Sequence, residues 1–103
     1  VNSALMNFTK AMAERGRTDG VRVNGINPGP VETERLTGRL AALAREAGVS
    51  EAEARTRLVA EQKVIRFGQP EEVAALVAFL DSPEGAFLHG ALIDIDGGAT
   101  KGM

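Results

Sequence analysis

The chain has 103 residues, of which 44% are hydrophobic and 25% are charged, a balance typical of one soluble domain or part of one. Its net charge of −2 offers no electrostatic surface for nucleic acid or an anionic membrane, and no apolar run approaches the roughly 18 residues of a membrane span. Cysteine is absent, which excludes disulfides and thiolate metal sites and favours a cytoplasmic protein.

The first part of the chain predicts a helix followed by a short strand. Four apolar residues recur at steps of four, three and four, which places them on one helical face: Val1, Leu5, Phe8 and Met12. This predicted helix is already in progress at the first residue. A loop follows at 16–20, and residues 21–26 (VRVNGI) have the alternation of a strand.

Two helices are predicted in the middle of the chain. The first carries apolar residues at helical spacing, namely Leu36, Leu40 and Leu43. Gly48 is expected to end this helix, because glycine adopts the left-handed conformation at helix ends. Ser50 and Glu53 have the spacing of a capping box, which predicts the start of the second helix.

A last helix and a last strand complete the pattern. Pro70 suits the first position of a helix over 70–81, since proline has no N–H to leave unpaired there. Its predicted buried face consists of Val73, Leu76, Val77 and Leu80. Residues 90–98 (GALIDIDGG) predict a strand and a Gly-Gly turn.

The order of these elements, helix, strand, two helices, helix and strand, indicates an α/β fold. A strand, a helical crossover and a second strand favour a right-handed parallel pair. Two strands are too few for a complete sheet, so we expect them to be part of a larger sheet whose other strands this sequence does not supply.

The run NGINPGPVET at 24–33 is the candidate binding site, because ligands bind open parallel sheets where strands end and helices begin. Pro28 and Pro30 stiffen this turn, and Gly29 lets the main chain approach a ligand. Thr33 is expected to cap the following helix or to turn its hydroxyl to a ligand. A purely structural turn has the same composition.

Other polar residues have simpler structural interpretations. His89 is the only histidine and has no evident partner, so it is expected at the entry of the last strand. Asp94 and Asp96 lack the further ligands of a cation loop. Lys63 and Arg66 are within reach of an anionic substrate tail, but surface roles account for them as well.

In four segments the chain resembles the carboxyl-terminal part of a short-chain dehydrogenase/reductase. The segments are 4–13 (ALMNFTKAMA), 21–33 (VRVNGINPGPVET), 66–83 (RFGQPEEVAALVAFLDSP) and 89–98 (HGALIDIDGG). They resemble, in order, the helix after the family's catalytic Tyr-x-x-x-Lys, its sixth strand and Pro-Gly turn, its last long helix and its seventh strand. The resemblance implies that residues 1–103 are the carboxyl-terminal portion of a doubly wound parallel Rossmann sheet whose N-terminal half is absent.

The resemblance also implies a function, namely hydride transfer between NAD or NADP and a small-molecule alcohol or carbonyl substrate. Family members commonly assemble as dimers or tetramers, so a homo-oligomer is expected. Residues 34–64 correspond to the family's substrate-binding helices, with Leu36 and Leu40 as the candidate apolar lining of the pocket.

Four residues of the turn are implied cofactor contacts. Pro28 and Gly29 would line the nicotinamide ring, and the backbone of Val31 would bond the carboxamide. Thr33 would add its hydroxyl to the carboxamide or to a phosphate.

The chain departs from the family pattern in its catalytic residues. It contains no tyrosine and no GxGxxG turn, so we expect it to be inactive alone. An ungapped match puts Asn2 where the family has its catalytic lysine, and an alignment shifted by one helical turn is the alternative. With Asn2 there, the competing function is a catalytically dead relative that serves as an interaction or oligomerisation module. A free-standing helical binding domain would require both strands to be misread.

Overall fold

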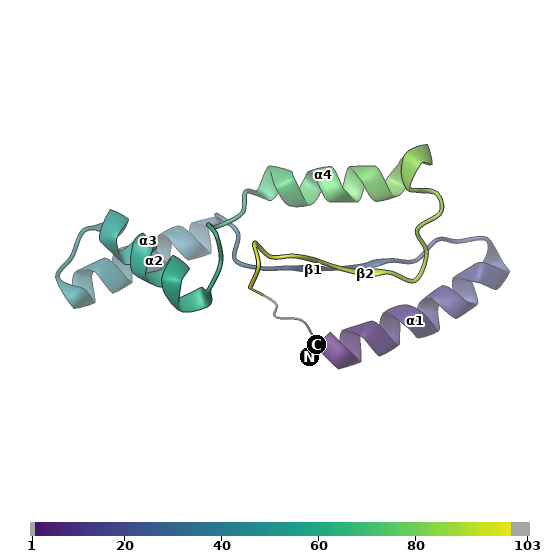
Figure 1. Ribbon diagram of the computed structural model, residues 1–103, viewed down its shortest axis with the longest axis horizontal. Helices are drawn as coiled ribbons and strands as arrows, with labels where there is room; N and C mark the ends of the chain where they lie inside the picture. Colours follow the sequence, from purple (N-terminus) through teal and green to yellow (C-terminus); the bar gives the residue numbers. More distant parts are fainter. Residues whose placement is uncertain (1, 100–103) are drawn as a thin grey trace.

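The computed structural model describes residues 2–99, apart from the side chain of Asn2, and measures 56 × 26 × 20 Å. Val1, the first member of the predicted helical face, lies outside the described residues. Helices α1 (Asn2–Asp19) and α4 (Pro70–Asp81) lie on opposite faces of a small sheet, and a helical hairpin projects from one end of it (Figure 1). Within residues 2–99, no helix is both long and apolar enough to cross a membrane.

The sheet consists of β1 (Gly25–Pro28) and β2 (Leu92–Ile95), which are parallel and pair Gly25 with Leu92 through Pro28 with Ile95. The predicted parallel pair is therefore confirmed. Because parallel strands end at the same edge, the turns that follow β1 and β2 lie side by side. Gly29 continues the pairing beyond β1, since its N–H donates to the carbonyl of Ile95 at 3.0 Å.

The prediction of a strand over 21–26 is wrong for its first four residues, because β1 begins only at Gly25. The segment opposite 21–24 is the loop before β2. Hydrogen bonds from side chains replace most of the backbone hydrogen bonds that a strand would make there. Arg22 donates to the carbonyls of Leu80 and Gly85 at 2.6 and 2.9 Å. Asn24 both donates to the Leu88 carbonyl and accepts from the Ala91 N–H, at 3.1 and 3.0 Å.

The apolar face predicted for α1 is largely exposed. Phe8 and Met12 are 64% and 43% exposed, whereas the side that meets the sheet carries smaller residues: Thr9, Ala13 and Gly16. Small residues let the helix approach β1 closely. A Cβ atom on Gly25 would lie 2.8 Å from the Thr9 hydroxyl, so this close approach requires glycine at position 25.

Helix α4 begins at Pro70 and ends at Asp81, as predicted, but its predicted buried stripe is wrong. Val73, Leu76 and Leu80 are half-buried, and Val77 is 50% exposed. The two strands of this chain are too narrow to cover the face of the helix. The short 3-10 helix η1 (Pro83–Gly85) follows, and Phe87 beyond it is fully exposed.

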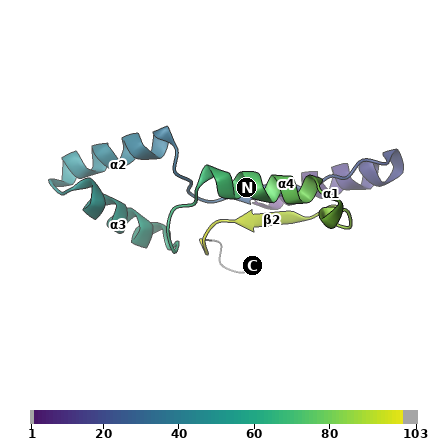
Figure 2. The same cartoon turned by 90° about the horizontal axis from the view of Figure 1, so that it is seen from above.

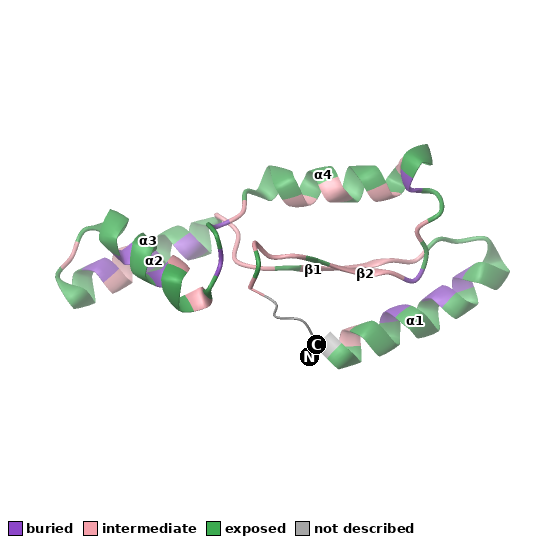
Figure 3. Ribbon diagram, viewed as in Figure 1, coloured by how far each residue is buried: buried purple, intermediate pink, exposed green. Residues whose placement is uncertain are grey.

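The main apolar core lies in the hairpin and not in the sheet (Figure 3). Helix α2 (Glu34–Ala47) runs away from the sheet and α3 (Glu51–Gln62) returns, as Figure 2 shows from above. The buried residues of this core, from both helices and the segment after α3, are Leu36, Leu40, Ala44, Ala54, Leu58, Val64 and Phe67. Gly48 and Ser50 cap α2 and α3 at the predicted ends.

Candidate functional site

The turn after β1 is held against the end of β2 by close contact at Gly29. A Cβ atom at this position would lie 2.7 Å from the Cβ and 2.8 Å from the Cα of Asp96. Real Cβ atoms do not come this near, so glycine is required here by the neighbouring strand. Packing against Asp96 therefore explains the glycine at position 29 without any reference to a ligand.

The next residues of the turn pair with the segment before α4. The Gly68 N–H donates to the Pro30 carbonyl at 2.9 Å, and the Glu32 N–H donates to the Gly68 carbonyl at 2.8 Å. In such a parallel bridge the central residue, here Val31, directs its own N–H and C=O to the opposite side. The backbone of Val31 therefore has its polar groups turned away from Gly68.

Thr33 is the N-cap of α2. Its Oγ1 accepts a hydrogen bond from the Leu36 N–H at 3.3 Å, so the predicted cap is confirmed. A threonine hydroxyl has one hydrogen and two lone pairs. Capping uses one lone pair and leaves the hydroxyl hydrogen as a donor at the exposed surface of the turn.

A groove of about 890 Å³ opens beside this turn, at the carboxyl ends of both strands. Five of the six predicted site residues line it, namely Pro28, Gly29, Val31, Thr33 and Leu36. Leu40 does not. It is only 2% exposed and belongs to the core between α2 and α3, where it supports the wall of the groove from behind.

Five polar residues of the groove were not among the predicted site residues: Asn27, Arg35, Arg39, Gln62 and Asp96. Arg35 and Arg39 could have been found, because they lie four residues apart on the helix that follows the Pro-Gly turn. Gln62 and Asp96 come from the end of α3 and the turn after β2, and only the folded chain brings them to the turn.

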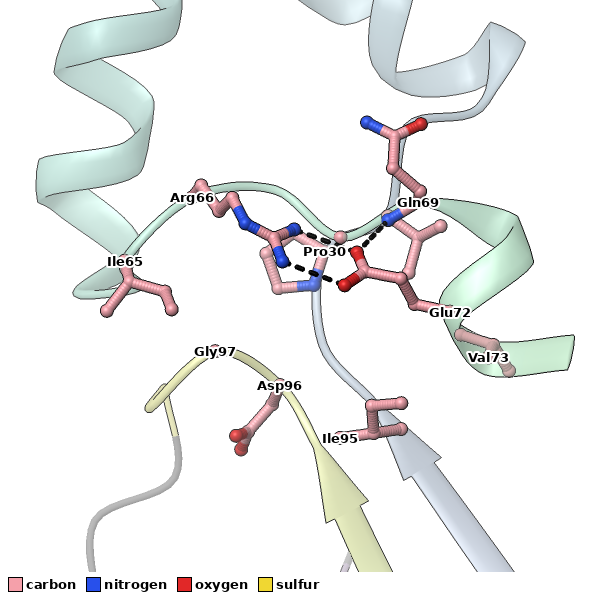
Figure 4. Close-up of a pocket in the computed structure, with 11 residues that line it drawn as sticks. Pro30, Ile65, Arg66, Gln69, Glu72, Val73, Ile95, Asp96 and Gly97 are labelled. Carbon is pink, nitrogen blue, oxygen red and sulfur yellow. Dashed lines mark hydrogen bonds and ion pairs between the residues drawn. The ribbon is translucent and has the colours of Figure 1, made fainter. Parts of the chain in front are cut away.

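A smaller cavity of about 90 Å³ adjoins the groove and shares Pro30, Val31 and Asp96 with it. Figure 4 shows Arg66 and Glu72 facing each other beside this cavity. The guanidinium of Arg66 donates to both carboxylate oxygens of Glu72 at 2.8 Å.

Glu72 also accepts a hydrogen bond from the Gln69 N–H at 2.8 Å, which joins the ion pair to the first turn of α4. The hydrogen bonds from Arg66 and from the Gln69 backbone lower the pKa of Glu72 from its ordinary value of 4.5 to about 2. This pair fixes the loop between α3 and α4 that carries Gly68.

The remaining candidate residues have structural roles. His89 accepts the Val23 N–H at Nδ1 and meets the Ala13 carbonyl through Nε2, so it joins α1 to the entry of the sheet, as predicted. Asp94 accepts a hydrogen bond from Asn27 at 2.9 Å. Over the described residues, no three His, Asp or Glu side chains are grouped to hold a metal.

Comparison with known proteins places this chain in a family. A family model described as enoyl-(acyl carrier protein) reductase matches residues 1–100. Meso-2,3-butanediol dehydrogenase of Serratia marcescens is 38% identical over 97 residues, which cover 94% of this chain and 34% of that protein. 3-Oxoacyl-(acyl-carrier-protein) reductase of Vibrio cholerae is 36% identical over 96 residues, which cover 93% and 35%.

Solved structures agree with the sequence relatives. L-sorbose reductase of Gluconobacter frateurii, in complex with NADPH and L-sorbose, matches with a TM-score of 0.85 and 31% identity over 98% of this chain and 39% of that one. The chain therefore belongs to the short-chain dehydrogenase/reductase family, and its sheet is part of a Rossmann fold. It spans about a third of the length of these curated relatives.

The contact at Gly29 predicts that Gly29→Ala lowers the free energy of unfolding by roughly 1 to 3 kcal/mol, as overpacking against a backbone does. The matched control is Gly38→Ala in α2, where a Cβ atom meets nothing within 4 Å. The same change there is expected to stabilise the helix by about 0.5 to 1 kcal/mol. Urea unfolding of both variants measures the difference, and equal effects at the two glycines would contradict the packing requirement.

The pKa of Glu72 predicts a loss of stability in acid. Because its pKa is lowered in the folded state, the pair stabilises the fold above pH 4.5, and this contribution is lost as the pH falls towards about 2. In Glu72→Gln, unfolding is expected to depend less on pH over this range. Glu71→Gln, which removes an acid from the same turn outside the ion pair, is the control. Identical pH profiles of the unfolding midpoint for the two variants would refute the assignment.

Proposed function

We propose that this chain supplies the nicotinamide side of the cofactor site and the wall of the substrate pocket in an NAD(P)-dependent oxidoreductase. The complete enzyme would interconvert an alcohol and a carbonyl compound by hydride transfer. The observation that carries the proposal is the groove at the carboxyl ends of β1 and β2, because that edge is where doubly wound sheets bind dinucleotides.

The groups along the turn suit the polar carboxamide of a nicotinamide. The Val31 backbone directs its N–H and C=O away from Gly68, and Thr33 has a hydroxyl hydrogen to donate. Pro28 and Gly29 supply a face with little side chain for the flat ring. NADPH in the related L-sorbose reductase supports a dinucleotide as the ligand of the complete enzyme.

The hairpin at 34–64 is proposed as the substrate-binding part. Leu36 supplies an apolar wall of the groove, and Leu40 holds that wall in place from the core behind it. Because the hairpin has a core of its own, it can present different side chains to the groove without disturbing the sheet.

We propose in addition that the protein associates with copies of itself. Large apolar residues point outward from α1, from α4 and from the segment after α4: Met6, Phe8, Met12, Phe79 and Phe87. Apolar surface of this extent is typical of interfaces. The same association would suit the alternative function, a catalytically dead relative that serves as an oligomerisation module. Asn2 at the position of the family's catalytic lysine would favour that alternative.

The role of Thr33 can be tested in the complete oxidoreductase. Thr33→Ala is expected to raise the KM for the cofactor about two- to twelvefold, which corresponds to one neutral hydrogen bond of roughly 0.5 to 1.5 kcal/mol. It also removes the cap of α2 and is expected to cost about 1 kcal/mol of stability. Thr33→Ser keeps the hydroxyl and is the control. Lost stability with an unchanged cofactor KM would reduce Thr33 to a helix cap.

The 103-residue chain alone is expected neither to bind a dinucleotide at micromolar concentration nor to transfer hydride. Its sequence holds no glycine-rich turn for the pyrophosphate and no tyrosine for proton transfer. Titration calorimetry with NADH and NADPH measures the first expectation, and micromolar binding by this chain would show that the turn suffices as a site.

A further inference from the structure

Two arginines on the groove side of α2 differ from most other arginines of the chain in having no partner. Within residues 2–99, the guanidinium groups of Arg35 and Arg39 make no ion pair and no hydrogen bond. Six others do, through carboxylates or carbonyls: Arg15, Arg17, Arg22, Arg55, Arg57 and Arg66. Arg45, near the other end of α2, is also unpartnered but lies outside the groove.

The positions of Arg35 and Arg39 are unfavourable for the helix itself. Like charges at i and i+4 repel each other by about 0.2 to 0.5 kcal/mol. Arg35 lies in the first turn of α2, where the positive end of the helix dipole also disfavours a cation. Glu32, three residues before Arg35, is already bound by Arg55. Over residues 2–99, no ion pair or hydrogen bond of these two guanidinium groups offsets the repulsion.

The pair lies along the groove, beyond the part next to the sheet. Helix α2 runs away from the sheet (Figure 2), and Arg35 and Arg39 follow Thr33 along it in sequence. Four residues of helix separate the two arginines by a rise of about 6 Å. Asp96 is the acid that lines the same groove, and its carboxylate accepts the Gly98 N–H within its own turn. The outer part of the groove thus carries two positive charges.

We infer that the groove takes a substrate whose end remote from the reacting carbon carries a carboxylate or a phosphate, bound by Arg35 and Arg39. This rests on the proposed function, in which the ring lies at Pro28–Val31 and the substrate extends along α2. Guanidinium groups bind planar and tetrahedral oxyanions through two parallel hydrogen bonds, which suits both anions. A bound anion would also relieve the repulsion between the two arginines.

The first test is independent of catalysis. Glutarate and inorganic phosphate are titrated into the 103-residue chain while the Nε–H signals of its arginines are followed by NMR. Saturable shifts at Arg35 and Arg39, with Arg45 unmoved, are the expected result. Equal shifts at all three arginines, or no saturation, would overturn the anion site. The double variant Arg35→Gln, Arg39→Gln is expected to lose the shifts and to melt at the same or a higher temperature, since it removes an unfavourable pair.

The second test asks whether a substrate carboxylate is the anion that the two arginines bind in the complete oxidoreductase. Oxo acids are compared with their primary amides of equal chain length. The double variant is expected to lower kcat/KM for the acids roughly ten- to hundredfold and to spare the amides, as for hydrogen bonds to a charged group. Arg45→Gln is the control and should change neither.

Two results of that comparison would overturn the inference. A raised KM for the cofactor with an unchanged ratio of acid to amide would assign the arginines to the phosphates of the dinucleotide. An equal loss with acids and amides would assign them to the shape of the groove. Failure to reduce any ketone would instead refute the oxidoreductase function, and the NMR titration alone would then decide whether the anion site exists.

Discussion

The contact between Gly29 and Asp96 is the constraint on which the site depends. Parallel pairing brings the ends of β1 and β2 to one edge, but only a residue without a side chain lets the turn after β1 lie directly against the turn after β2. This contact fixes the direction in which the chain leaves the sheet. The bridge at Val31, the cap at Thr33 and the axis of α2 all follow from it.

Stability and binding are separated in space along this chain. The buried apolar side chains gather in the hairpin, and the sheet contributes hydrogen bonds and closely packed glycines. Arg66 and Glu72 hold the loop between the two parts. The groove lies where these parts meet. One of its sides is the rigid turn after β1, and the other is the pair of helices of the hairpin.

The sequence predicted the element order, the parallel pair and the helix ends, because capping residues and turns act locally. Helix α2 ends at Gly48, α3 is capped by Ser50 and α4 begins at Pro70. Each of these effects depends on local backbone geometry and not on the rest of the fold. The buried stripe of α4 was misjudged for the opposite reason. Periodicity identifies an apolar stripe such as Val73, Leu76 and Val77, but it does not tell whether this chain supplies the surface that covers it. Gln62 and Asp96 entered the groove through tertiary contact alone.

The bridge between Val31 and Gly68 has a consequence for how such proteins diversify. Both passages of the chain between sheet and hairpin go through this neck, where two hydrogen bonds tie them together. Whatever is inserted, deleted or exchanged between them starts and finishes at the same place. The sequence and length of the hairpin can therefore change in evolution, while the strands keep their register and the turn keeps its shape.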